Sequence, residues 1–274
     1  MRYLENYRNL DLINGSVADE ALLTAAGREI SRLPQPFMAH ILTSATHHPY
    51  MIPEQLRTLH LGSLDGTMLG DYLQAVHYLD TSIGELLDEL QASGILDRTV
   101  LALLGDHHPY PDDPLAVAEA LGRPATDYTL WDLDKRLPLL VRFPRGQYAQ
   151  TIGMPSGHID LLPTLLGILG VPIDTEVTLG RDATAGNSQA AFVVFRDGSF
   201  VAGRSAFVAP SRFDEAPRCF NLETGDVTGC APLEGLRPRA EERLRMSDLI
   251  IGADLIPDIR LTLKSHSASS HEGH

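Results

Sequence analysis

The sequence predicts an α/β fold in which a layered, mostly parallel sheet is flanked by helices and followed by a small antiparallel C-terminal extension. Apolar runs typical of buried strands alternate with stretches that have the period of amphipathic helices, which favours the layered sheet. Beyond residue 190 the apolar period shortens and glycine-containing turns appear, which favours the extension. With 274 residues and 43% hydrophobic side chains, the chain is long enough to bury a large core.

The first half of the chain alternates helices and strands. In chain order we expect a helix over 18–33, a strand over 37–43, a polar loop over 44–50, a helix over 69–90 and a strand over 99–104. Pro34 ends the first helix, and Gly94 follows the second as a C′ glycine. The two predicted strands are short and apolar, as buried strands are, and polar loops follow them.

The second half changes character along its length. We expect a short helix near 115–121, a short strand over 137–143, a helix over 156–169, a hairpin within 190–222 and a helical stretch within 233–256. Pro163 falls in the early part of its helix, where a proline is tolerated. Gly198 marks the hairpin turn.

The charge balance excludes some partners. The formal net charge is -14, so nucleic acid and anionic lipid surfaces would be repelled rather than bound through a basic patch. No apolar run is long enough to span a membrane, and residues 1–10 lack the apolar core of a signal peptide. We therefore expect no targeting segment within the sequence as written.

The only two cysteines, Cys219 and Cys230, flank a turn-like segment. A disulfide closing a small hairpin would form in an oxidising compartment, but spacing alone leaves the bonded and the free state open.

The strand over 99–104 delivers Asp106 and His107 to its end, inside the sequence Gly-Asp-His-His-Pro. Ligands gather at the carboxyl ends of strands in open α/β sheets. A carboxylate oxygen and an imidazole nitrogen both suit zinc, manganese or a similar divalent ion. The pair therefore predicts half of a metal site.

A second histidine loop follows the strand over 37–43, where His47 and His48 precede Pro49. An imidazole there can ligate a metal, donate to a phosphoryl or sulfuryl oxygen, or carry a proton. One such loop is more often structural than catalytic, but two loops at the same sheet edge favour a functional site.

Four separate motifs occur in a fixed order along the chain. They are Pro36-Phe37 with Ser44 to Tyr50, Tyr72 to Asp80 with Ile83-Gly84, Gly105-Asp106-His107, and Ile159 to Leu166 with Leu169-Gly170. In their order and spacing these motifs resemble the sulfatase-type branch of the alkaline phosphatase superfamily, and within it lipoteichoic acid synthases and related phosphoglycerol transferases.

The resemblance implies a single-metal site in which a threonine attacks the phosphorus of an ester. Asp106 and His107 would ligate one divalent ion, either Mn²⁺, Mg²⁺ or Zn²⁺, and His47, with His48 beside it, would contact the substrate head group. The substrate would be a phosphoester or a sulfate ester, including one on a lipid head group. A membrane-associated, extracytoplasmic location is implied as well.

The resemblance is best over residues 15–175. It assigns residues 1–185 to the C-terminal part of a sulfatase-like catalytic domain, 186–260 to a hairpin and helix extension of that domain and 261–274 to a disordered tail. In the family the nucleophilic threonine and an acidic ligand lie upstream of this stretch. We therefore identify no nucleophile here, and expect a missing N-terminal half or membrane anchor.

Three questions stay open: whether the chain is catalytic, whether it holds its own nucleophile, and whether His108 reaches the metal. The chain is either part of a metal-dependent phosphoryl transferase or ester hydrolase, or an inactive remnant that serves as a binding module. A hydroxyl of the histidine loop, Thr46 or Ser44, could replace the missing nucleophile. The family usually has an aromatic residue or glycine where His108 stands, so His108 could itself reach the metal.

Overall fold

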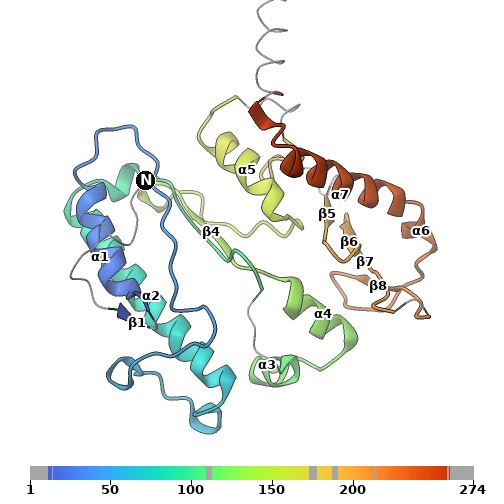
Figure 1. The fold of residues 1–274 in the computed structure, drawn as a ribbon, viewed down its shortest axis with the longest axis horizontal. Coiled ribbons are helices and arrows are strands. Elements are labelled where there is room, and N and C mark those ends of the chain that lie inside the picture. The colour runs from blue at the N-terminus through green and yellow to red at the C-terminus, as the bar shows by residue number, and fades with distance from the viewer. Residues whose placement is uncertain are drawn as a thin grey trace, which may run out of the picture. The chain divides into compact units, whose positions relative to one another are not determined.

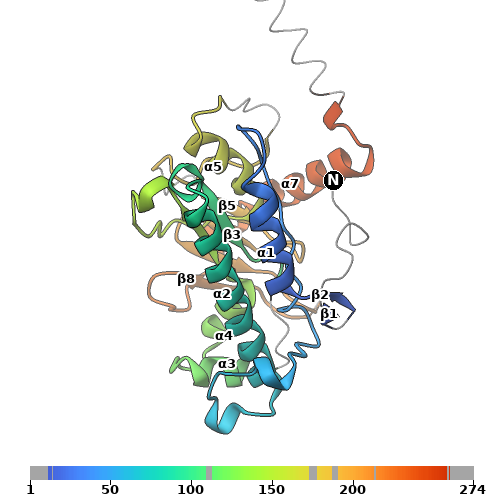
Figure 2. The same cartoon turned by 90° about the vertical axis from the view of Figure 1, so that its left-hand side faces the viewer.

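The computed structural model describes residues 12–13, 15–108, 113–172, 178–186, 191–212, 214–257 and 259. The chain divides into two units, Met1–Ala149 and Gln150–His274, whose elements are labelled in Figure 1 and seen from the side in Figure 2. The predicted tail over 261–274 lies outside the described residues.

Two long helices organise the first unit, and both were predicted. They are α1 (Asp19–Ile30) and α2 (Met68–Ala92), which lie side by side in both views (Figures 1 and 2). The unit's other elements are β1 (Leu12–Ile13), β2 (Ser16–Val17), the 3₁₀ helices η2 (Glu54–Leu56), η3 (Gly62–Leu64), η4 (Leu96–Arg98) and η5 (Pro144–Gly146), β3 (Leu101–Leu104), α3 (Pro114–Ala120), α4 (Asp127–Lys135) and β4 (Leu139–Arg142).

The helix pair buries an apolar seam. Its fully buried members are Leu23, Leu86, Leu90, Ile95 and Leu96. At the start of α2 the Thr67 hydroxyl accepts the Gly70 N–H, as an N-cap should. At its end Gly94 adopts φ +70°, and the Ile95 N–H donates to the Leu90 carbonyl. The caps of α2 and the spacing of its apolar residues in the sequence are thus consistent with its packing against α1.

The strands β3 and β4 pair antiparallel, whereas the sequence predicts a mostly parallel sheet. β3 and β4 confirm the strands expected over 99–104 and 137–143, but they run antiparallel, with Leu101 opposite Arg142 and Leu104 opposite Leu139. The chain returns through α3 and α4 and enters β4 beside the end of β3, so the two directions oppose. Every strand ladder among the described residues is antiparallel.

The strand predicted over 37–43 is wrong for the described residues, where this segment belongs to no ladder. Phe37 and Ile41 pack on the helix-pair seam, whereas Met38 is 91% exposed and Leu42 69% exposed. The segment therefore packs on the helices through Phe37 and Ile41 without a neighbouring strand. Directly after the segment, the N–H groups of Ser44 and Ala45 donate to the Asp19 carboxylate and not to a neighbouring strand.

The second unit holds an antiparallel sheet, confirming the predicted extension. Its strand order is β5 (Phe192–Val194), β6 (Phe200–Ala202), β7 (Ser205–Val208) and β8 (Arg218–Asn221), accompanied by η6 (His158–Asp160), α5 (Leu161–Ile168), α6 (Ala231–Glu234) and α7 (Arg237–Gly252). Gly198, at φ +84°, makes the predicted turn between β5 and β6. Phe192, Phe200 and Phe207 form most of the core beneath the sheet.

Two local features of this unit refine the expectations. The α-helix predicted from residue 156 begins at Leu161, because the Gly157 N–H donates to the Asp160 carboxylate and a 3₁₀ turn precedes the helix. Cys219 and Cys230, left open by the sequence, form a disulfide with a Cα–Cα distance of 5.4 Å.

Membrane crossing requires a long apolar helix. In the part of the chain that the structure describes, no helix has both the length and the apolar character for it.

Candidate metal and substrate site

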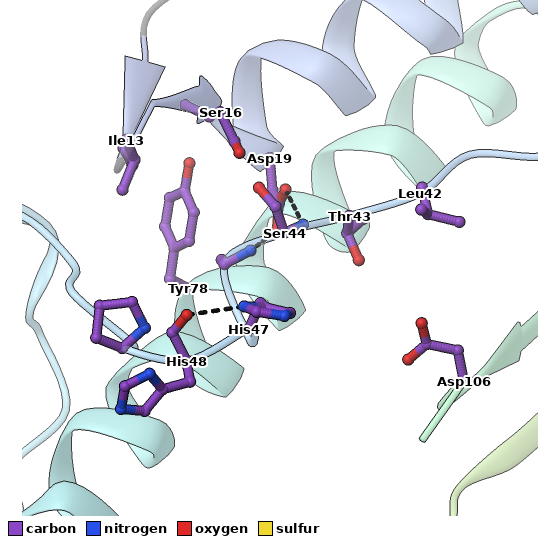
Figure 3. Close-up of a pocket in the computed structure, with 13 residues that line it drawn as sticks. Ile13, Ser16, Asp19, Leu42, Thr43, Ser44, His47, His48, Tyr78 and Asp106 are labelled. Atoms are coloured by element: carbon purple, nitrogen blue, oxygen red, sulfur yellow. Dashed lines mark hydrogen bonds between the residues drawn. The ribbon is translucent and has the colours of Figure 1, made fainter. Parts of the chain in front are cut away.

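The two histidine loops predicted to face each other do meet, at a pocket in the first unit. The pocket has a volume of about 370 Å³, and His47, His48 and Asp106 are among the residues that line it. Figure 3 shows Asp106 at the end of β3, across the pocket from His47. The predicted site residues are therefore brought together even though the parallel ladder that suggested it is not formed.

The loop over 44–50 is built from two consecutive turns. The His47 N–H donates to the Ser44 carbonyl at 3.0 Å, and the Tyr50 N–H donates to the His47 carbonyl at 3.1 Å. His47 thus stands at the junction of the turns, where its side chain is exposed. Tyr50, only 1% exposed, packs edge-on against Tyr72 with ring centroids 5.2 Å apart and anchors the far end of the loop.

The near end of the loop is held by Asp19, the first residue of α1. One carboxylate oxygen accepts the Ser44 N–H at 2.8 Å and the other accepts the Ala45 N–H at 2.9 Å (Figure 3). Tyr78, from α2, borders the same pocket, and its hydroxyl accepts the Glu20 N–H at 3.1 Å. Burial raises the pKa of the Tyr78 phenol.

The Asp106 and His107 side chains present their donor atoms outward. They are 78% and 56% exposed, and His107 Nε2 lies 3.8 Å from Asp106 Oδ1. Two donors that each bind one ion at roughly 2.0–2.2 Å lie within about 4 Å of each other, so this spacing fits a shared divalent ion. Carboxylate oxygen with imidazole nitrogen is also a donor set that such ions take.

Hydrogen bonds to carbonyls orient both imidazoles. His107 Nδ1 lies 2.9 Å from the His108 carbonyl oxygen, and His47 Nδ1 lies 2.7 Å from the His48 carbonyl oxygen. A carbonyl only accepts, so each Nδ1 carries the proton and each neutral ring keeps its lone pair on Nε2. The rings of His47 and His107 stand perpendicular with centroids 6.1 Å apart.

The other candidates lie differently. His108 Nδ1 is 3.8 Å from Asp134 Oδ1 of α4, so it faces that helix. Ser44 lines the pocket and Thr46 is not among the lining residues. Within the described ranges, no group of three or more His, Cys, Asp or Glu side chains gathers as a complete metal site would require.

Sequence reasoning missed several residues of the pocket, among them Asp19 and Tyr78. Asp19 looked like an ordinary acidic residue at a helix start, where the helix dipole favours a negative charge. Tyr78 lies within a strongly periodic helix and looked like a core residue. No pattern in the sequence around either residue indicates that it contacts a loop far away along the chain.

The family model named Sulfatase matches residues 2–171, well over half of the chain. The chain belongs to the sulfatase family. This sulfatase-family chain is 28% identical over 250 residues to lipoteichoic acid synthase 1 of Bacillus subtilis (strain 168), and 24% identical over 247 residues to lipoteichoic acid synthase of Staphylococcus aureus (strain USA300). The matches cover 90% and 89% of this chain and 37% of each relative. The chain thus spans little more than a third of the length of these curated relatives.

Solved structures confirm the fold. The lipoteichoic acid synthase LtaP from Listeria monocytogenes aligns with a TM-score of 0.76 at 25% identity, over 89% of this chain and 62% of that one. A protein in the alkaline phosphatase superfamily from Vibrio parahaemolyticus aligns with a TM-score of 0.62 at 20% identity, over 93% of this chain and 58% of that one. The sulfatase-family chain therefore has the predicted alkaline phosphatase-like α/β fold.

Proposed function

We propose that this sulfatase-family chain carries the metal-binding and head-group-binding part of a site that transfers or hydrolyses phosphoesters. Asp106 and His107 hold a divalent ion, Mn²⁺, Mg²⁺ or Zn²⁺, and His47, with His48 beside it, contacts the substrate. The observation that carries the proposal is the spacing of 3.8 Å between His107 Nε2 and Asp106 Oδ1, with Asp106 lining the pocket that His47 also lines.

The roles follow from the donor atoms. When bound, a divalent ion polarises an ester oxygen and stabilises the charge that develops on it. His107 offers the unprotonated Nε2 as a ligand, because its Nδ1 proton is held by the His108 carbonyl. His47, held in the same way, keeps Nε2 available to contact an ester oxygen or a hydroxyl of the head group.

Two protein donors do not complete such a site. Structural and catalytic zinc sites use three or four protein ligands, and covalent transfer needs a nucleophile. The remaining ligand and the nucleophile belong, in this proposal, to residues beyond those that the structure describes. Ser44 is the hydroxyl of the loop that borders the pocket, and it is the less favoured nucleophile because nothing described here activates it.

The substrate and the location are part of the proposal. Similarity to lipoteichoic acid synthases favours a phosphoester, in particular a phosphoglycerol group on a lipid, over a sulfate ester. The disulfide between Cys219 and Cys230 supports an extracytoplasmic location, because such bonds persist in oxidising compartments.

Metal binding and turnover test this function. The 274-residue chain is titrated with Mn²⁺ by calorimetry and assayed with p-nitrophenyl phosphate, a phosphodiester and a sulfate ester. In Asp106→Ala we expect Mn²⁺ affinity to fall at least tenfold, because one of the two donors is gone. Asp88→Asn, which removes an exposed carboxylate of α2, is the matched control and should bind Mn²⁺ as the parent does.

The outcomes separate the alternatives. Mn²⁺ binding that is equal in the parent and Asp106→Ala overturns the proposed metal site. Mn²⁺ binding at Asp106 with no turnover of any ester supports the alternative in which the chain is an inactive binding module.

A further inference from the structure

Asp19 is a buried carboxylate that accepts hydrogen bonds from the histidine loop. It is 1% exposed, and its two oxygens accept one backbone N–H each, from Ser44 and Ala45. The helix that Asp19 begins does not use it as a cap: Ala18 is the N-cap residue of α1, and no side chain caps there. The carboxylate therefore serves a segment 25 residues away rather than its own helix.

A carboxylate suits this geometry better than any neutral side chain. The two N–H donors come from consecutive residues and need two acceptors side by side. An asparagine of the same shape offers one acceptor and would direct its amide N–H groups at the other donor. A buried charge is tolerated only where hydrogen bonds replace the lost water, and the two bonds here do so.

The two bonds hold the loop at the point from which His47 projects. The Ser44 carbonyl accepts the His47 N–H, so fixing Ser44 and Ala45 fixes the first turn of the loop. Tyr50, buried against Tyr72, holds the second turn. Between these two anchors His47 has little freedom to move away from His107, whose ring lies 6.1 Å from its own.

We propose that Asp19 is the positioning residue of this site: its buried carboxylate clamps the loop over 44–50 so that His47 faces the Asp106–His107 pair. What His47 contacts rests on the function proposed above, but the clamp itself is a property of the metal-free chain. Asp19 touches no metal or substrate in this proposal and acts only through the loop.

The test compares Asp19→Asn with the parent chain by NMR, without metal or substrate. We expect the nuclear Overhauser effect between the His47 and His107 rings to disappear and the Ser44 and Ala45 amides to exchange at least tenfold faster. The Mn²⁺ affinity should stay within twofold of the parent, because Asp106 and His107 follow a different element, β3. A merely structural role would change stability and leave the ring-to-ring effect in place.

Glu20→Gln is the matched control, because Glu20 lies in the same first turn of α1 and its side chain is exposed. It should leave the ring-to-ring effect and both amides unchanged. If Asp19→Asn does not fold, Asp19→Glu keeps the charge and shifts the acceptors by one methylene. It should displace the resonances of the Ser44 and Ala45 amides together with those of His47.

An unchanged ring-to-ring effect in a folded Asp19 variant overturns the clamp. Failure of the parent to bind Mn²⁺ overturns the proposed function instead and leaves these metal-free readouts valid.

Discussion

At the scale of single residues, the site depends on where two protons sit. His47 and His107 each donate from Nδ1 to the carbonyl of the residue that follows, at 2.7 and 2.9 Å. The same short-range hydrogen bond therefore occurs in both loops. It leaves an unprotonated Nε2 on His47, which lines the pocket, and on His107, whose ring lies 6.1 Å from that of His47. Orientation by a carbonyl is how proteins commonly fix the tautomer of a metal-binding histidine.

This arrangement predicts the tautomers directly. In ¹⁵N spectra recorded above the pH at which the rings are charged, both His47 and His107 should show protonated Nδ1 and unprotonated Nε2. Adding Zn²⁺ should perturb Nε2 of His107 and leave its Nδ1 protonated. His77, which contacts the Thr58 hydroxyl through Nε2, is the internal comparison and should not respond. Protonated Nε2 in His107 would contradict the proposed ligand role.

Some residues of the candidate site could be predicted from their neighbours in the sequence, and others could not. Asp106, His107 and His47 could be predicted because each follows an apolar run and carries a side chain suited to metals or phosphoryl oxygens. Asp19 could not, since its partners lie 25 and 26 residues along the chain. A long-range contact of this kind leaves no trace in spacing or periodicity.

At the scale of elements, the α1–α2 pair carries the loop that bears His47. Asp19 begins α1, and Tyr78 belongs to α2, where it packs in a buried cluster with Tyr50. Periodicity and caps predicted both helices. The antiparallel sense of β3 and β4 could not be predicted, because strand direction is decided by the path of the intervening chain, which includes the unpredicted helix α4.

The seam gives an element-scale prediction. Leu90 is 2% exposed and packs within the buried cluster of α1 and α2. Leu90→Ala should lower the free energy of unfolding by about 2–5 kcal/mol, through lost apolar burial and the cavity left behind. Urea unfolding followed by circular dichroism measures it. Val76→Ala, at a position of α2 that is 37% exposed, should cost clearly less, and equal losses would contradict the packing.

At the scale of the whole molecule, the chemistry and the covalent cross-link belong to different units. Every residue of the proposed site lies within Met1–Ala149. The unit Gln150–His274 has its own aromatic core, in which Cys219 is a buried member, and the disulfide ties β8 to the residue that precedes α6. The stability of the second unit therefore depends on the redox state of its surroundings. The proposed metal donors lie in the first unit.

The disulfide should stabilise the second unit by limiting its unfolded state. Cys219 and Cys230 are 11 residues apart, and closing a loop of that length is worth about 3 kcal/mol in the chain-entropy description. The double variant Cys219→Ser with Cys230→Ser should therefore unfold at lower urea concentration than the oxidised parent. Adding dithiothreitol should bring the parent close to the variant and leave the variant itself unchanged. A parent whose unfolding midpoint does not change with the reductant would contradict the predicted stabilisation by the disulfide.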